Sequence, residues 1–159
     1  MAELCLTSLQ RKLLQIIQSD FPIVSRPYQE LAQQVGASES EVIETIRQFC
    51  EQRVIRDFAP VFDYRRLGYV STLAMVSVPA EQVEQVAAVI NAYPEVTHSY
   101  LRDHRYNLWF TVIASSEEHI QHLLTEIEAK AGCPPIQTLP AQHVFKINVA
   151  FDFGQEESQ

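Results

Sequence analysis

The sequence predicts an α+β protein of two domains, in which three helices precede a β-α-β-β-α-β order of elements. Apolar residues recur at helical spacing in the first third of the chain, and alternating strand-like runs separate two further helices in the rest. A length of 159 residues is enough for compact units with cores of their own. We expect a first domain over residues 1–62, a second over 63–153 and a loose polar tail over 154–159.

The first domain contains three predicted helices followed by a short β-ribbon. Each helix carries apolar residues on one side, and Gly36 before the third helix suits a left-handed helix end. The third helix opens on a capping box, Ser38-Glu39-Ser40-Glu41. Helix, turn and helix followed by a ribbon predict a winged helix-turn-helix. The predicted helices span residues 7–19, 27–35 and 39–53, and the ribbon spans 54–62.

The third helix is the one that enters the DNA major groove in this arrangement. Here its first turn is acidic, which suits the helix dipole but repels phosphate. We therefore expect a retained scaffold or dimerisation module, with DNA binding as the alternative. The residues that such binding would use are Arg47, Gln48, Gln52, Arg56, Arg65 and Arg66.

The second domain reads as a ferredoxin-like fold, in which two helices cover one face of a four-stranded sheet. Apolar residues of the first strand also fall on the open face, whichever alternation is chosen. An apolar sheet face needs a cover, so we expect a dimer that packs sheet against sheet. The predicted strands are 69–78, 96–102, 105–114 and 143–151, and the predicted helices are 80–92 and 116–131.

A dense polar and aromatic string, residues 98–111, makes the predicted hairpin the candidate site. With a tight turn at Asp103-His104, six of its side chains share one face. The predicted cross-strand pairs are Arg102 with Arg105, Tyr100 with Asn107, and His98 with Trp109. Two opposed arginines repel unless an anion lies between them, so this face suits a planar ligand with carboxylates. The alternative is a solvated edge hairpin with scattered polar residues.

The charge distribution points to the same place. The chain has a formal charge of −8, which does not favour non-specific attraction to nucleic acid or anionic membrane. Residues 67–159 contain four Lys or Arg against eleven Asp or Glu. Three of those four cations, Arg102, Arg105 and Lys146, fall on the predicted strands or their turn, which predicts an anion site there.

Cysteine usage and hydropathy suggest the compartment. Cys5, Cys50 and Cys133 are far apart and show no metal-ligand spacing, which fits a reducing cytoplasm and argues against structural zinc or disulfides. No apolar run approaches the roughly twenty residues that span a bilayer, and the N-terminus lacks a signal-peptide pattern. We expect a cytoplasmic protein without a membrane partner.

The order of elements, and the connector Pro60–Gly68, resemble the Lrp/AsnC family of amino-acid-responsive regulators. The string Val96–Thr111 resembles more specifically the siroheme decarboxylases, an Lrp/AsnC-derived group whose paralogous subunits pair. Within it, Arg102–Thr111 is like the branch of alternative heme biosynthesis, whereas the heme d1 branch has a longer turn. The regulators usually show Gly-x-Tyr/Phe-Asp at this hairpin, from which Asp103–Asn107 departs.

The resemblance implies an enzyme that removes carboxyl groups from two acetate arms of siroheme. The product would be 12,18-didecarboxysiroheme, on a route to heme. No added cofactor or electron acceptor is implied, because the iron tetrapyrrole of the substrate withdraws the electrons. A paralogous subunit is the implied partner, with a homodimer as the alternative.

The residues of the string fit that chemistry. Arginine suits bidentate carboxylate binding, and histidine is the default acid for returning a proton to the carbon that loses CO₂. We favour His104 as proton donor or contact to the substrate iron, before His98 and His143. The predicted carboxylate-binding cations are Arg102, Arg105 and Lys146. The predicted orienting or stacking residues are Tyr100, Tyr106, Asn107 and Trp109. The predicted register also allows a core position for Tyr106, and Trp109 fits a dimer interface equally well.

Two other functions remain open. One is an Lrp/AsnC-type transcriptional regulator that binds a small effector and shows salt-dependent DNA binding. The other is a non-catalytic tetrapyrrole-binding subunit whose partner performs the chemistry.

Overall fold

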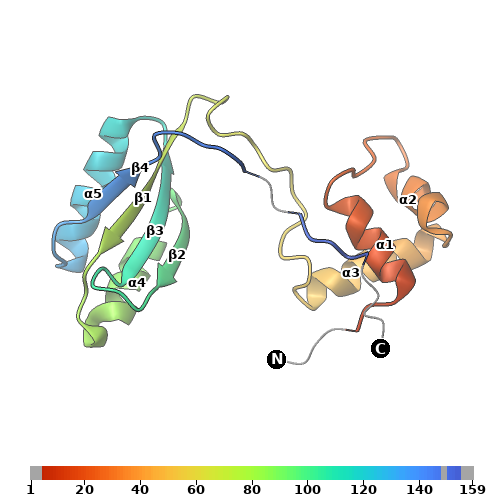
Figure 1. Ribbon diagram of the computed structural model, residues 1–159, viewed down its shortest axis with the longest axis horizontal. Coiled ribbons are helices and arrows are strands. Elements are labelled where there is room, and N and C mark those ends of the chain that lie inside the picture. The colour runs from red at the N-terminus through yellow and green to blue at the C-terminus, as the bar shows by residue number, and fades with distance from the viewer. Residues whose placement is uncertain (1–4, 148–149, 155–159) are drawn as a thin grey trace. The chain divides into compact units, whose positions relative to one another are not determined.

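The computed structural model describes residues 5–147 and 150–154, in two compact units (Figure 1). One unit contains the described residues up to Pro60 and those from Lys146 onward, and the other runs from Val61 to Phe145. The boundary expected from the sequence lay at residues 62 and 63. Apart from Gly154, the predicted tail lies outside the described residues.

The helical unit confirms the three predicted helices, α1 (Ser8–Ile17), α2 (Pro27–Val35) and α3 (Glu39–Glu51). The Thr7 hydroxyl accepts from the Gln10 backbone N–H and caps α1. At the end of α2, Gly36 adopts φ 75°, a conformation that costs glycine little. The buried core of this unit consists of Leu13, Leu31, Ala32, Val42 and Ile46.

The predicted β-ribbon at residues 54–62 is wrong, since the structure shows no strand there. The chain reverses at Arg53, which has φ 56°. The backbone N–H groups of Val54 and Ile55 then both donate to the Phe49 carbonyl, at 2.9 and 3.0 Å. These donors close the end of α3 and are not available to a strand ladder.

The second unit is a four-stranded antiparallel sheet with strand order β2-β3-β1-β4. A core of aliphatic residues and Phe110 fills the space between the sheet and two helices. This is the predicted ferredoxin-like arrangement. The elements are β1 (Val70–Val76), the 3₁₀ turn η1 (Ala80–Gln82), α4 (Val83–Asn91), β2 (Val96–Leu101), β3 (Leu108–Ala114), α5 (Glu117–Ala131) and β4 (Gln137–Pro140).

The last strand is not where the sequence predicted it. The strand that pairs with β1 is Gln137–Pro140, whereas residues 143–147 have no regular structure. Asn148 and Val149, expected in the predicted strand, lie outside the described residues. Further along, Gln18, the residue after α1, bonds the backbone of Phe151: its side-chain amide donates to the Phe151 carbonyl at 2.7 Å and accepts from the Phe151 N–H at 2.8 Å.

In the part of the chain that the structure describes, no helix combines the length and apolar character needed to cross a membrane.

Candidate functional site

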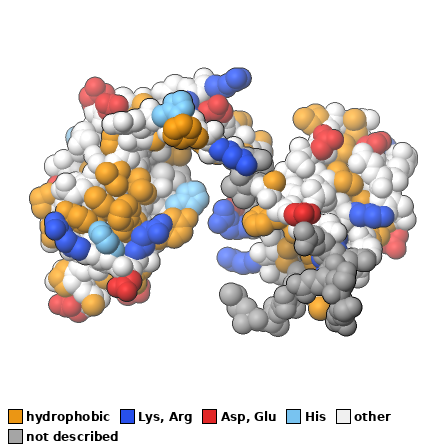
Figure 2. Space-filling model, viewed as in Figure 1, with side chains coloured by type: hydrophobic (Ala, Val, Ile, Leu, Met, Phe, Trp, Pro, Cys, Tyr) orange, Lys and Arg blue, Asp and Glu red, His pale blue; other side chains and the backbone are white. Residues whose placement is uncertain are grey.

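The open face of the sheet, opposite α4 and α5, combines polar, apolar and aromatic side chains in two rows that cross all four strands. The strand register aligns Tyr100, Trp109, Met75 and Gln137 in one row, and His98, Thr111, Leu73 and Leu139 in the next. Figure 2 shows hydrophobic side chains gathered over the strands, with His and Lys or Arg side chains beside them. The sequence did not point to Gln137 and Leu139, because their short strand has no clear alternation.

The hairpin register differs from the predicted one. Tyr100 pairs with Trp109 and His98 with Thr111, so the pairs Arg102–Arg105, Tyr100–Asn107 and His98–Trp109 are wrong. The strands stop at Leu101 and resume at Leu108, and residues 102–107 form the connection. Because the register moves by an even number of residues, His98, Tyr100 and Trp109 still share the open face.

The connection, which we call the 102–107 loop, is organised around the backbone of Tyr106. The Trp109 indole N–H donates to the Tyr106 carbonyl at 2.6 Å, and the Tyr106 N–H donates to His104 Nδ1 at 3.1 Å. In this bond Nδ1 accepts, which requires the tautomer with its proton on Nε2; the same Nδ1 lies 3.3 Å from the Tyr106 carbonyl, to which a protonated Nδ1 can donate. The loop is closed by the Arg102 N–H, which donates to the Asn107 carbonyl at 2.7 Å.

The two arginines of the loop are supported by aromatic rings. The Arg102 guanidinium lies 5.7 Å from the Trp109 ring centroid and 5.8 Å from that of Tyr100. Arg105 lies 4.9 Å from the Tyr106 ring and donates to its hydroxyl at 3.0 Å. Within residues 5–147 and 150–154, neither guanidinium forms an ion pair with a carboxylate. Their charges are therefore available to an external anion.

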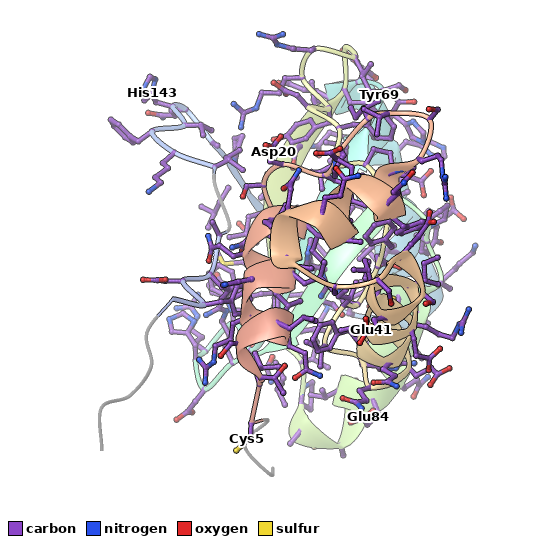
Figure 3. The ribbon with its side chains drawn as sticks, turned by 90° about the vertical axis from the view of Figure 1, so that its right-hand side faces the viewer. Cys5, Asp20, Glu41, Tyr69, Glu84 and His143 are labelled. Carbon is purple, nitrogen blue, oxygen red and sulfur yellow. The ribbon has the colours of Figure 1, made fainter. Side chains whose placement is uncertain are left out.

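The histidines occupy different places. His104 lies in the loop, 6.2 Å from the Trp109 ring centroid, and His98 stacks on Tyr100 at 6.2 Å in the next row along β2. His143, expected on the last strand, lies instead on the irregular chain after β4, where it points outward (Figure 3) and contacts Phe145 at 4.5 Å between centroids.

Two other predicted ligand residues have different surroundings from those expected. Lys146 does not lie on the sheet, because residues 143–147 form no strand and Lys146 groups with the helical unit. Both amide atoms of Asn107 bond the backbone of Val78, at 2.9 and 2.7 Å. Tyr106, for which a core position was considered, is half-buried in the loop.

Comparison with known proteins identifies the family. Residues 66–146 match the AsnC-like ligand binding domain, and residues 10–56 match the siroheme decarboxylase NirDL-like HTH domain. The siroheme decarboxylase NirD subunit of Stutzerimonas stutzeri is 44% identical over 147 residues, covering 92% of this chain and 95% of that protein. The chain belongs to the siroheme decarboxylase family. The resemblance to the siroheme decarboxylases is thereby confirmed.

Other siroheme decarboxylase subunits extend the comparison. The alpha subunit of Desulfovibrio desulfuricans is 44% identical over 144 residues, covering 91% of this chain and 83% of that protein. The NirG subunit of Stutzerimonas stutzeri is 32% identical over 143 residues, covering 90% of this chain and 97% of that protein.

Solved structures agree with this assignment. The crystal structure of the siroheme decarboxylase NirDL in complex with an iron-uroporphyrin III analogue superimposes with a TM-score of 0.64 at 33% identity, over 89% of this chain and 48% of that chain. The present chain thus spans about half of it. The structure of E. coli AsnC gives a TM-score of 0.79 at 20% identity, over 92% of this chain and 99% of that chain, which shows a shared fold.

Proposed function

We propose that this chain is a carbon-carbon lyase subunit that removes CO₂ from two acetate side chains of siroheme and yields 12,18-didecarboxysiroheme on a route to heme. The observation that carries the proposal is the 102–107 loop. It presents two arginines, before and after His104 in the sequence, that have no carboxylate partner among the described residues, in a chain 44% identical to siroheme decarboxylase subunits.

The substrate is a flat macrocycle fringed by carboxylates, and each part of it has a counterpart here. Arg102 and Arg105 bind carboxylates, and the open face with Met75 and Leu73 packs against the ring. The Trp109 ring lies under Arg102, and its indole N–H donates to the Tyr106 carbonyl. We therefore propose that Trp109 positions Arg102 and does not stack on the macrocycle.

The reaction breaks the bond between the acetate methylene carbon and its carboxyl carbon. The electron pair passes into the macrocycle and CO₂ leaves. Protonated His104 then gives its Nε2 proton to the new methyl group, and the neutral imidazole keeps its remaining proton on Nδ1, 3.3 Å from the Tyr106 carbonyl. No electrons are gained or lost overall, so we propose that no cofactor is needed beyond the substrate's own iron tetrapyrrole. His98, one row away, is the second candidate for the proton donor.

A partner subunit is part of this proposal. The open face exposes Leu139 at 47% and Tyr100 at 50% in the single chain. Stutzerimonas stutzeri has both a NirD and a NirG subunit, which supports pairing of this chain with a paralogue. We also propose that the chain works in a reducing cytoplasm, a location that the free thiols of Cys5, Cys50 and Cys133 suit.

The helical unit supports an enzyme rather than a DNA reader. At the start of α3, Glu39 forms an ion pair with Arg26 at 2.6 Å, and Glu41 accepts from the Ser38 hydroxyl at 2.6 Å. These carboxylates occupy the turn that would approach phosphates. We therefore propose that the helix-turn-helix serves as a scaffold, and a mobility-shift titration at low salt with no retarded DNA is the expected result.

The experiment for the main proposal is anoxic incubation of the chain with siroheme, alone and with the paralogous subunit. Mass spectrometry should show loss of two CO₂ in at least one of the two mixtures. If siroheme binds but keeps its mass in both, the chain is a tetrapyrrole-binding subunit and the catalytic proposal fails.

A further inference from the structure

At the end of the β1–β3 ladder, a side chain takes the place of a backbone partner. The last regular pair is Val76 with Leu108, so a continued ladder would place Val78 opposite Tyr106. Instead, the Asn107 side chain accepts from the Val78 N–H at 2.9 Å and donates to the Val78 carbonyl at 2.7 Å. A single amide thus satisfies both backbone groups of Val78, which is buried.

Because the Asn107 side chain bonds Val78, the backbone of Tyr106 makes no ladder hydrogen bonds with Val78. Its N–H donates to His104 Nδ1 at 3.1 Å, and its carbonyl accepts from the Trp109 indole at 2.6 Å. The same carbonyl lies 3.3 Å from His104 Nδ1. If Tyr106 continued the ladder with Val78, these groups would bond across the strands and His104 would lose its backbone partners.

The backbone of Tyr106 can serve His104 in both protonation states. Neutral His104 accepts the Tyr106 N–H at Nδ1, whereas the imidazolium can donate from Nδ1 to the Tyr106 carbonyl. Because that carbonyl already accepts from Trp109, the neutral ring should favour the tautomer with its proton on Nε2. When the imidazolium gives up its Nε2 proton, it retains the Nδ1 proton and can still donate it to the Tyr106 carbonyl; the resting neutral ring accepts from the Tyr106 N–H instead. Nδ1 therefore stays bonded to the Tyr106 backbone throughout, and the ring keeps its orientation.

We propose that Asn107 is a positioning residue for His104. By bonding Val78 in place of Tyr106, it keeps the Tyr106 backbone facing Nδ1 and so fixes both the tautomer and the orientation of the imidazole. Its effect on turnover rests on the proposed decarboxylase function, whereas its effect on the tautomer does not.

The chain offers a matched control. Gln18 makes the same two-point bond between a side-chain amide and one backbone residue, at 2.7 and 2.8 Å to Phe151, within the helical unit. Removing that amide costs a similar pair of hydrogen bonds but has no connection to Tyr106. Gln18→Ala therefore measures the general effect of losing such a bond.

The test is ¹⁵N NMR of the histidine ring nitrogens in the full chain, at an alkaline pH where imidazoles are neutral. Wild type and Gln18→Ala should show His104 protonated on Nε2, and Asn107→Ala should show a mixture of tautomers. In the active assembly, Asn107→Ala should lower kcat by about 10- to 100-fold, as expected for a misplaced catalytic group, with KM changed far less. Gln18→Ala should keep both constants.

Asn107→Asp provides the second variant, should Asn107→Ala fail to fold by circular dichroism. It retains the side-chain shape and the bond from the Val78 N–H, but its second oxygen faces the Val78 carbonyl, acceptor against acceptor, so a mixture of tautomers and a lowered kcat are expected here too. An unchanged His104 tautomer in a folded Asn107 variant overturns the inference. A changed tautomer in a chain whose wild type never decarboxylates siroheme supports the positioning role and overturns the proposed function.

Discussion

Arginines in the two units have different partners. In the helical unit, Arg26 and Arg47 each lie 2.6 Å from a glutamate oxygen. In the 102–107 loop, Arg102 and Arg105 lie over aromatic rings and, among the described residues, have no carboxylate partner. The paired arginines contribute modestly to stability, whereas those over aromatic rings keep a full charge for a ligand. The comparison separates residues that hold the fold from residues that bind.

The largest effect on turnover should come from replacing His104, which lies between Arg102 and Arg105 in the sequence. His104→Gln removes the proposed proton donor while keeping a polar side chain of similar length. Turnover should fall about 10²- to 10⁴-fold, the usual contribution of general acid catalysis, while siroheme binding is retained. Anoxic single-turnover absorbance and a binding titration measure the two quantities. Full activity of the variant would transfer the role to His98 or to the partner subunit.

The next largest effect should be on siroheme binding, when an arginine of the 102–107 loop is replaced. Arg102→Ala should weaken siroheme binding by about 10- to 100-fold, because a charge-assisted hydrogen bond contributes roughly 1.5–3 kcal/mol. Its matched control, Arg26→Ala, should leave binding unchanged and lower the free energy of unfolding by less than about 1 kcal/mol. Titration with siroheme and urea unfolding of both variants provide the data. Equal binding losses in the two would remove the distinction between the units.

The smallest effect concerns the acidic start of α3. Hydrogen bonds from the Ser38 side chain and backbone hold the pKa of Glu41 below its ordinary value. A carboxyl whose pKa is lowered in the folded state adds stability above its unfolded pKa and loses that contribution as the pH falls through the folded pKa. Glu41→Gln should therefore differ most from wild type near neutral pH and converge with it in acid. Thermal melts across this range test the trend, and a difference that grows in acid would contradict it.

The elements that the sequence predicted well have local signals. Pro27 and Gly36 bound α2 at Pro27–Val35, and the Ser38 capping box begins α3. The polar and aromatic string also located the candidate site and the face shared by His98, Tyr100 and Trp109. In these cases the neighbouring residues alone determine the outcome.

The elements that were missed depend on contacts distant in sequence. The 102–107 loop, where the hairpin register departs from the predicted one, includes Asn107, whose amide bonds Val78, a residue distant in sequence that no periodicity reveals. The fourth strand, Gln137–Pro140, is too short for an alternation, while residues 143–147 alternate strongly and pair with no strand. The predicted sheet positions of His143 and Lys146 were wrong because both residues belong to this unpaired segment.

The most direct test of the central claim is decarboxylation of siroheme in D₂O under anoxic conditions, in the assembly that contains this chain. The account predicts loss of two CO₂ and one solvent deuteron in each new methyl group for wild type, because an exchangeable acid returns the proton. Under single-turnover conditions His104→Gln should leave the substrate mass nearly unchanged. Siroheme that is bound tightly but recovered with both acetate arms intact from the wild-type assembly would contradict the account.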